Sequence, residues 1–394
     1  MRLAPKNLCS GCTACFAVCP ASAIRMAEDG EGFGYPVVDD ALCTRCGVCE
    51  KACPVLRRAP PREPFSVHAA INRDESVRMR SSSGGIFTLL ARQVFSTGGI
   101  VFGAGWSHDF RVVHTAAENE VELADLRGAK YVQSDLGDVF QQVAGQLATG
   151  REVLFSGTPC QIAGLRSFLA ESRRVSDADV RHLLCVDVVC FATPSPKVFA
   201  LYKQELEARH GASATQIVFR DKLGGWANYA LSVVFGNGQT YRAPHGQDPY
   251  LQGFVKGLYN RPSCSGCAFR ELRSGADITI ADYWKVRDKF PAMDDDKGTS
   301  LVLATTPAGC ERVKALRSGV GGEAAIWAES DYADARLKNA AIYRSFVGHK
   351  NRDAFFARLE NGPVSTLIRR LLRPSLSRRL RAFFRRRRLD APAT

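Results

Sequence analysis

The feature that most constrains this chain is a cysteine run that occurs twice near the N-terminus. Both copies read C-x2-C-x2-C-x3-C-P, the first at Cys9, Cys12, Cys15 and Cys19 and the second at Cys43, Cys46, Cys49 and Cys53. Three thiolates at this spacing can bind three corners of one 4Fe-4S cube, and in proteins with two cubes the fourth cysteine of each run binds the other cube. The repeat therefore predicts two 4Fe-4S clusters with crossed ligation.

The crossed arrangement assigns four thiolates to each cluster: Cys9, Cys12, Cys15 and Cys53 to one, and Cys19, Cys43, Cys46 and Cys49 to the other. It ties together two halves of a segment too short for a real hydrophobic core, so metal binding supplies folding free energy. Structural zinc is the alternative, but zinc is usually bound by two separated C-x2-C pairs. Residues 1–56 thus resemble a bacterial-type dicluster ferredoxin domain.

Length and composition place these runs in a globular protein. The 394 residues, 45% of them hydrophobic, suffice for two or three domains. No apolar run approaches the roughly 20 residues of a membrane span, and the N-terminus has no secretory signal, so we expect a cytoplasmic protein. There, 14 cysteines indicate metal or redox chemistry rather than disulfides.

The net charge of +13 is concentrated at one end of the chain. Residues 369–394 hold ten Arg and one Asp, which leaves only +4 for the remainder and argues against a general nucleic-acid surface. In this segment the Arg residues interleave with Leu and Phe. Such segments bind anionic membranes or acidic partners, which would place the protein at the inner face of the membrane. A solvated tail is the alternative.

Between these ends, the pattern predicts a linker and a large α/β body. Residues 57–66 contain three prolines and no apolar periodicity, which is typical of an exposed linker. Alternating strand and helix patterns follow, with strands predicted at 67–71, 99–106, 111–116, 152–156, 183–189, 230–235, 239–243, 278–281 and 300–305, and helices at 84–95, 136–147, 161–169 and 196–208. We therefore predict an α/β body over 67–345, with a mixed sheet flanked by helices, after a small α+β ferredoxin-like domain. Residues 346–394 form the predicted helical, Arg-rich tail.

Two loops of the body have residues suited to binding a ligand. Residues 80–85 (Arg-Ser-Ser-Ser-Gly-Gly) open a predicted helix, where free amides can bind an anion. An ordinary Ser N-cap is the alternative. The other loop leads from a strand through Gly157, Thr158 and Pro159 to Cys160 at a helix start. That position lowers a thiol pKa, so Cys160 is a nucleophile, a metal ligand or a small buried residue, and we favour the ligand.

Four cysteines of the body predict a third 4Fe-4S cluster. Cys160 and Cys190 each follow a strand of the same apparent sheet, so both can face one end of it. Cys264 and Cys267 form an isolated C-x2-C pair. Four unrelated structural thiols are the alternative. Cys185 lies on the opposite strand face from Cys190, and Cys310 is interpreted as structural.

Further motifs identify a family resemblance. In order, they are Ser82–Phe87, Lys130–Ser134, Phe155–Gln161, Phe219–Lys222, Gly225-Trp226, Arg261–Cys264 with Cys267, and Asp277–Trp284. Their order and content resemble the family of coenzyme F420 hydrogenase/dehydrogenase beta subunits, in a version with a ferredoxin fused in front, over about residues 1–345. Many bacterial relatives have Cys-His-Gly-Val-Pro-Ser where this chain has Cys190-Phe191-Ala192-Thr193-Pro194-Ser195. This departure puts in doubt the donor or acceptor near that loop.

The resemblance implies an FAD-containing, iron–sulfur oxidoreductase. Its flavin would exchange hydride with F420 or another soluble donor or acceptor and pass single electrons to the clusters or to a redox partner protein. The implied cofactor-binding residues are Ser82, Ser83, Gly84, Gly85, Lys130, Gln133, Ser134, Gly157, Thr158, Pro159 and Lys222. The rival functions are a pure electron carrier and an interaction scaffold in polysaccharide biosynthesis. The sequence identifies neither a catalytic residue nor the substrate.

Overall fold

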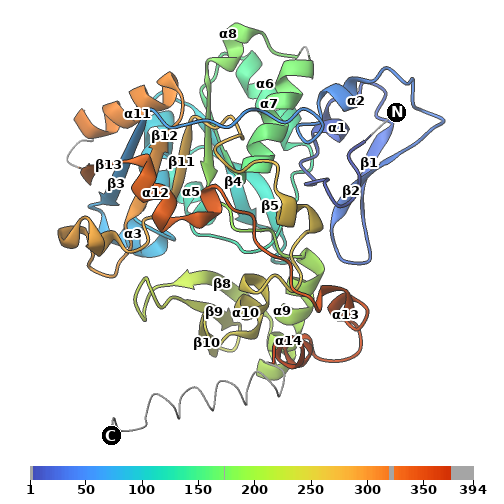
Figure 1. The fold of residues 1–394 in the computed structure, drawn as a ribbon, viewed down its shortest axis with the longest axis vertical. Coiled ribbons are helices and arrows are strands. Elements are labelled where there is room, and N and C mark those ends of the chain that lie inside the picture. Colours follow the sequence, from blue (N-terminus) through green and yellow to red (C-terminus); the bar gives the residue numbers. More distant parts are fainter. Residues whose placement is uncertain (1–2, 173, 319–323, 374–394) are drawn as a thin grey trace, which may run out of the picture.

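A computed structural model describes residues 3–172, 174–318 and 324–373, and its centre is a large mixed sheet (Figure 1). In the described residues this sheet has eight strands in the order β13-β3-β12-β11-β7-β6-β4-β5. Their bounds are β3 Ser66–Asn72, β4 Ile100–Trp106, β5 Val112–Ala117, β6 Val153–Gly157, β7 Leu183–Val188, β11 Ile278–Asp282, β12 Ser300–Ala304 and β13 Ala325–Ser330. The predicted α/β body with a mixed sheet is confirmed.

The strand directions explain why the sequence shows short continuous apolar runs. The four central strands β11, β7, β6 and β4 pair in parallel, whereas the pairs toward both edges are antiparallel. Central strands covered on both faces lose the alternation of apolar and polar residues. In β7, for example, the first five of six residues are buried.

Helices cover both faces of the sheet. Phe155 of β6 packs toward α6 and α7 on one face, and its neighbour Leu154 packs toward α4 and α11 on the other, as strand alternation requires. The helices are α4 Ile86–Phe95, α5 Glu120–Leu126, α6 Val139–Ala148, α7 Pro159–Ser172 and α11 Pro307–Ser318.

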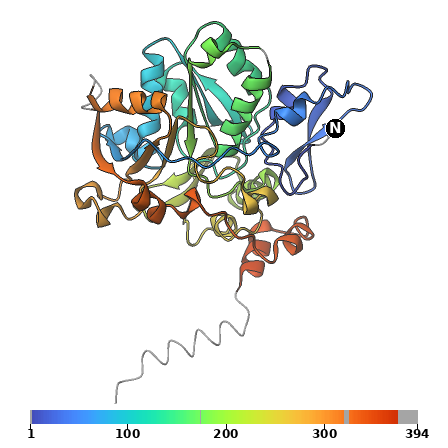
Figure 2. The same ribbon diagram turned by 45° about the horizontal axis from the view of Figure 1, so that its top comes forward.

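The N-terminal segment packs against α7 (Figure 2). It consists of a hairpin and two single-turn helices, with the bounds α1 Ala14–Ala17, β1 Ile24–Glu28, β2 Gly34–Val38 and α2 Val48–Lys51. Its buried residues continue into the core formed by α6, α7 and the sheet. The proline-rich segment that follows lies along the body, because the Arg62 N–H donates to the Glu271 carbonyl and Arg273 donates to the Ala59 carbonyl.

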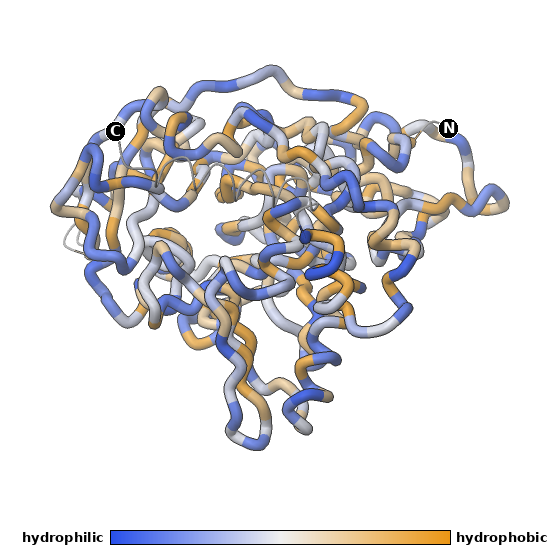
Figure 3. The backbone as a smooth tube through the Cα atoms, turned by 60° about the horizontal axis from the view of Figure 1, so that its bottom comes forward, coloured by the Kyte–Doolittle hydropathy of each residue, from blue (hydrophilic) through white to orange (hydrophobic). Residues whose placement is uncertain are grey.

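A second, aromatic-rich core lies beside the main sheet. A three-stranded antiparallel sheet packs there with the C-terminal helices. Its elements are β8 Ala214–Asp221, β9 Ala230–Phe235, β10 Thr240–Pro244, α9 Pro196–His210, α10 Pro249–Val255, α13 Arg352–Phe356 and α14 Val364–Leu372. Figure 3 shows apolar segments gathered inside the molecule.

The remaining elements connect these layers. They are α3 Glu75–Arg80, α8 Asp177–Val180, α12 Tyr332–Lys338 and the 3-10 helices η1 Pro262–Gly266, η2 Val286–Asp288, η3 Pro291–Met293 and η5 Ala340–Ile342. No helix among the described residues is long and apolar enough to cross a membrane.

Most predicted strands and helices are confirmed, with differences at a few ends. The helix predicted from residue 84 begins at Ile86, since Gly85 adopts a left-handed conformation (φ 83°). In the body, the sequence patterns missed β8 and β13 and the helices α3, α5, α8, α10 and α12. Most of the predicted Arg-rich amphipathic tail lies outside the described residues, which end at residue 373.

Candidate metal centres

The duplicated cysteine run folds into two matching turns. After its second cysteine each run has a residue in the left-handed conformation, Thr13 (φ 62°) and Gly47 (φ 73°), and a single helical turn follows. The two turns, α1 and α2, are in contact. The repeated sequence therefore forms a repeated local structure. Its eight cysteines lie in two groups.

The first group consists of Cys9, Cys12, Cys15 and Cys53, which line one pocket. Burial raises the pKa of Cys12 to about 12, and the neighbouring thiols of Cys9 and Cys53 raise it as well. Burial also raises the pKa of Cys15. Such thiols stay protonated unless a bound metal compensates the thiolate charge. These are the four cysteines that crossed ligation assigns to one cluster.

The second group brings Cys19, from the first run, beside the cysteines of the second run. Burial raises the pKa of Cys49, and the nearby thiols of Cys19 and Cys46 raise it further. Cys43 is half-buried and Cys46 is exposed. A backbone N–H at Val48 lowers the pKa of Cys46. The structure thus places each run's fourth cysteine with the other run, and the ligation itself remains a prediction.

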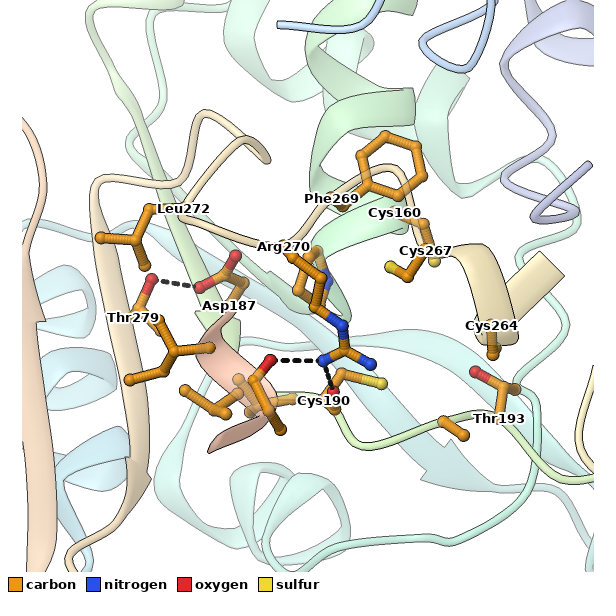
Figure 4. A pocket seen from close by; sticks show the side chains of 16 residues that line it. Cys160, Asp187, Cys190, Thr193, Cys264, Cys267, Phe269, Arg270, Leu272 and Thr279 are labelled. Atoms are coloured by element: carbon orange, nitrogen blue, oxygen red, sulfur yellow. Dashed lines mark hydrogen bonds between the residues drawn. The ribbon is translucent and has the colours of Figure 1, made fainter. Parts of the chain in front are cut away.

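The body brings together Cys160, Cys190, Cys264 and Cys267, which line one pocket (Figure 4). Cys160 is the second residue of α7, directly after β6, and Cys190 follows β7. Because β6 and β7 are parallel neighbours, their carboxyl ends meet at one edge of the sheet. The 3-10 helix η1 supplies Cys264 and ends at Cys267.

These four thiols are largely buried together. Burial raises the pKa of Cys190 to about 12, and the thiols of Cys264 and Cys267 contribute. Burial also raises the pKa of Cys160 and of Cys264. Protonation of Cys160, Cys190 and Cys264 would be favoured without a metal, so the donor set fits a thiolate-bound cluster.

A buried guanidinium points among the same four thiols. Arg270 is 7% exposed and donates to the backbone carbonyls of Cys190, Phe191 and Ala341. Within the described residues it forms no ion pair, and its Nε has no hydrogen-bond partner. An uncompensated buried cation is costly. The pocket therefore fits an anionic occupant, as a cluster with four thiolates is.

Sites for single metal ions are a separate matter. Among the described residues, no group of three or more His, Cys, Asp or Glu side chains is arranged to hold one metal ion.

The predicted cofactor loops lie side by side. The Ser82 hydroxyl accepts a hydrogen bond from the Ala129 N–H at 2.6 Å, which joins the first loop to the segment before Lys130. Gln161 donates to the Ser134 hydroxyl at 2.7 Å and accepts from the Thr158 N–H at 2.8 Å. The loops Ser82–Gly85, Lys130–Ser134 and Gly157–Pro159 are therefore connected by hydrogen bonds.

Several polar groups in these loops already have partners within the protein. The Ser83 hydroxyl donates to the Thr299 carbonyl, and the Gly84 N–H donates to the Ser300 hydroxyl. A Cβ on Gly84 would lie 2.4 Å from the Ala70 carbonyl oxygen, so β3 and β12 enclose this glycine. Ser83 and Gly84 hold the loop to the sheet in this structure.

Of the two predicted lysines, Lys222 is buried and Lys130 is half-buried. Lys222 Nζ donates to the carbonyls of Arg78, Ser83 and Lys297, and burial lowers its pKa to about 7. Burial also lowers the pKa of Lys130 to about 7, and its Nζ donates to the Arg127 and Gly128 carbonyls. In the described part of the chain neither lysine forms an ion pair. Both are therefore suited to an anionic neighbour.

Among the described residues, the Gln133 side chain forms no direct hydrogen bond with the other predicted cofactor residues. Its side chain lies between the body and the N-terminal segment, where it donates to the Ser10 carbonyl and accepts from Arg261. Sequence reasoning did not single out Arg261 or Arg270 as site residues. Arg261 entered only as the first residue of the motif Arg261–Cys264, and the only sequence signal for Arg270 was proximity to Cys267.

Asp187 and His114 are two more residues that the sequence did not indicate. Asp187 lines the four-thiol pocket and accepts hydrogen bonds from Ser274 and Thr279, and burial raises its pKa to about 7. His114 contacts the Ser134 hydroxyl, and burial lowers its pKa to about 4, which keeps the imidazole neutral.

The other two cysteines of the body lie outside the pocket. Cys185 is fully buried on β7 and packs in the core between the sheet and α7. Cys310 packs at the edge of the core on the opposite face of the sheet.

Comparison with known families confirms the predicted resemblance. Residues 150–322 match the family described as the C terminus of the coenzyme F420 hydrogenase/dehydrogenase beta subunit, and residues 8–56 match the 4Fe-4S dicluster domain. The dicluster domain implies two 4Fe-4S clusters.

Curated relatives match parts of the chain. One subunit of the F(420)H(2) dehydrogenase of Methanosarcina mazei is 23% identical over 199 residues, which are 46% of this chain and 54% of that protein. One subunit of the Na(+)-translocating ferredoxin:NAD(+) oxidoreductase complex of Acetobacterium woodii is 50% identical over 46 residues, 12% of this chain and 13% of that protein. The chain thus spans about half or less of the length of these two relatives.

Among solved structures, a chain of the F420-reducing [NiFe] hydrogenase complex from Methanosarcina barkeri is similar. It is 18% identical, with a TM-score of 0.49, and the alignment covers 77% of this chain and 94% of that chain.

Proposed function

We propose that this chain is an iron–sulfur flavoprotein oxidoreductase. The premise is that residues 150–322 match the family of coenzyme F420 hydrogenase/dehydrogenase beta subunits and that residues 8–56 match a 4Fe-4S dicluster domain. It exchanges electrons between a soluble hydride donor or acceptor, such as F420, and 4Fe-4S clusters by way of FAD. A redox protein is the proposed partner. The division into residues 1–56, 57–66, 67–345 and 346–394 is part of this proposal.

The observation that carries the proposal is the four-thiol pocket of the body. Cys160, Cys190, Cys264 and Cys267 come from three separate parts of the fold, yet they line one pocket together with the buried cation of Arg270. A pure docking module has no need of such a site. A third cluster there, beside the loop Gly157–Pro159, supports electron transfer between the body and the N-terminal domain.

The proposed FAD site lies where the three loops meet. When bound, a flavin supplies the conversion between two-electron hydride chemistry and one-electron transfer. The chain's own contribution is electrostatic and positional: Lys130 and Lys222 supply positive charge for a pyrophosphate, and Ser82 fixes the two loops to each other. The fit is partial, because Ser83 and Gly84 direct their polar groups to Thr299 and Ser300.

Iron analysis of the full chain tests the third cluster. Anaerobically reconstituted protein is expected to hold about twelve irons per chain, and Cys160→Ser about eight, because one cube is lost. Cys185→Ser is the control, since that thiol is buried in the core but lies outside the pocket, and it should retain about twelve. A wild-type content of about eight overturns the third cluster.

Flavin release on denaturation tests the FAD site. The wild-type protein should release FAD, whereas Lys130→Glu should lose FAD and keep its iron, because a carboxylate repels the pyrophosphate. Lys314→Glu, an exposed change on α11, is the control. FAD retained at full occupancy in Lys130→Glu rejects this site.

Anaerobic mixing with reduced F420, and separately with NADH, tests the substrate class. Oxidation of a donor with simultaneous bleaching of the iron–sulfur absorbance supports the oxidoreductase. Intact clusters without flavin or donor oxidation would instead indicate the electron carrier or the interaction scaffold in polysaccharide biosynthesis.

A further inference from the structure

The side chain of Arg261 lies between the N-terminal domain and the body. It is the largest of the fully buried side chains, with 1% exposure. It directly precedes η1, which supplies Cys264 and ends at Cys267. A buried guanidinium at this position needs an explanation, because an arginine is rarely fully buried unless it is paired.

Toward the N-terminal domain, the guanidinium contacts the first cysteine of the duplicated run. Nε donates to the Cys9 carbonyl at 2.8 Å, and Nη2 donates to the Gly34 carbonyl at 2.9 Å. Nη2 also lies 3.9 Å from the Cys9 sulfur. The ring of Tyr35 is 4.3 Å from the guanidinium carbon, so an aromatic face covers the cation.

Toward the body, the same residue is held by its backbone and by one amide side chain. Its N–H donates to the Thr193 carbonyl, and its carbonyl accepts from the Cys264 N–H at 3.1 Å. Nη1 donates to Gln133 Oε1 at 2.9 Å. Arg261 therefore connects the ligand loops of two different thiol groups.

The positive charge of Arg261 has only neutral acceptors. Within the part of the chain that the structure describes, it forms no ion pair. Arg352 provides a contrast in the same interface, because its guanidinium pairs with Glu31 and its Nε donates to the Asn260 carbonyl. The field of Arg261 is thus not cancelled by a paired carboxylate. It acts on the Cys9 sulfur at 3.9 Å, and more weakly on the Cys264 thiol, whose raised pKa it lowers only as the last of several causes.

A second contact places the same thiol group against the body. A Cβ on Gly164 of α7 would lie 2.8 Å from Cys12 Cβ and 3.1 Å from its sulfur. Cys160 lies one turn earlier on this helix. In the other N-terminal group, Cys46 is exposed, where water screens charge. The two N-terminal groups therefore differ in electrostatic environment although their sequences repeat.

We infer that Arg261 tunes the iron–sulfur cluster bound by Cys9, Cys12, Cys15 and Cys53. Reduction adds one electron and hence one negative charge to that cluster, without making or breaking a bond, and the buried guanidinium stabilises the more negative form. Arg261 thereby raises the reduction potential of this cluster relative to the other N-terminal cluster. This inference rests on the clusters of the proposed function.

A redox titration of the full chain with dithionite, followed by EPR, tests the inference. In Arg261→Gln, the one-electron reduction equilibrium of the cluster bound by Cys9 should become at least tenfold less favourable, which lowers its midpoint potential by about 59 mV. The other N-terminal cluster should keep its potential. Arg261→Lys keeps the charge and should keep most of the potential. Arg25→Gln, which removes an exposed arginine of the N-terminal domain whose charge is screened by water and salt, should leave every potential almost unchanged.

The shifted cluster is identified in a Cys46→Ser background, where the other N-terminal cluster lacks a ligand. The shift should persist there. An unchanged potential in iron-replete Arg261→Gln, or an equal shift of all clusters, overturns the inference. A wild-type protein without iron would instead overturn the proposed function.

Gln133→Glu keeps the inference testable if Arg261→Gln does not fold. The new carboxylate would lie at the position of Gln133 Oε1 and neutralise the guanidinium in place. The same cluster should again become harder to reduce. An unchanged midpoint potential in this variant overturns the inference.

Discussion

The N-terminal thiol groups and the body's four-thiol pocket are built in opposite ways. In the N-terminal domain all eight cysteines lie between Cys9 and Cys53, and the helices that present them are four residues long. In the body the cysteines lie between Cys160 and Cys267, at the ends of strands and helices of a large buried sheet. We expect the first region to need metal to define its structure, whereas the second positions its thiols by means of a hydrophobic core.

The largest expected effect tests the dependence of the N-terminal domain on metal. Cys53→Ser should abolish the cluster that also uses Cys9, Cys12 and Cys15, because that cluster loses its fourth thiolate ligand. Iron should fall by about four per chain, and limited proteolysis should now cut within residues 1–56 while the body resists. Selective loss of the cluster built on Cys43, Cys46 and Cys49 would contradict crossed ligation.

A core substitution tests the opposite dependence of the body. Leu90 of α4 is fully buried against the sheet face remote from the thiols. Leu90→Ala should lower the free energy of unfolding by about 2–5 kcal/mol through lost burial and a cavity, measured by urea unfolding followed by tryptophan fluorescence. The iron content should not change. The control is Val121→Ala at an 83% exposed position, with almost no effect; a comparable loss there would refute the argument.

A smaller effect concerns pH and the edge of the sheet in the body. Burial lowers the pKa of His68 to about 4, with Arg317 adding to the shift and Glu329 opposing it. Below the ordinary pKa of 6.5 the unfolded chain binds a proton that the folded chain refuses, so stability falls as pH decreases from about 6.5 toward 4.

Replacing His68 tests this pH dependence. His68→Phe should reduce the slope of unfolding free energy against pH by at most about 1.4 kcal/mol per pH unit. The measurement compares urea midpoints at pH 7 and pH 5. The edge-on contact with Trp327 is retained by a phenyl ring. Parallel pH slopes in the variant and the wild-type protein would show that another group controls the decline.

The smallest expected effect concerns an exposed ion pair between the linker and the body. Arg57 and Glu171 form an exposed ion pair at 3.4 Å between the start of the linker and α7. Arg57→Ala should change the free energy of unfolding by less than about 0.5 kcal/mol, since exposed pairs contribute little. Protease resistance at the interface should also be unchanged. A loss above about 1 kcal/mol would mean that this exposed ion pair contributes substantially to joining the regions.

The sequence predicted much of the fold because its signals are local. Proline, glycine and apolar periodicity located the linker, most strands of the main sheet and the helices α4, α6, α7 and α9. Strands β8 and β13 escaped notice. In β8 the buried positions are interrupted by irregular pairing with β9, so neither a simple alternation nor a continuous apolar run is present. The burial of β13 likewise follows no strict alternation, and its start is defined by pairing with β3.

The candidate site was harder to predict from the sequence, because its residues are far apart along the chain. The sequence could name Cys160, Cys190, Cys264 and Cys267 as candidates, but only the parallel pairing of β6 with β7 and the position of η1 bring them to one pocket. It also indicated Ser83 and Gly84 for a cofactor, whereas the Ser83 hydroxyl bonds to Thr299 and the Gly84 N–H to Ser300, at the start of β12.

The spacing of the cysteine runs determined the chemistry of the N-terminal domain without any tertiary information, since a cube accepts thiolates only at short and regular intervals. Which of the two N-terminal groups faces the body was decided only by the tertiary structure. Arg261 and Gly164 lie far along the chain from Cys9 and Cys12, and their contacts depend on how α7 and η1 pack against the first thiol group. Packing of this kind is set by burial across the whole fold, which no local pattern encodes.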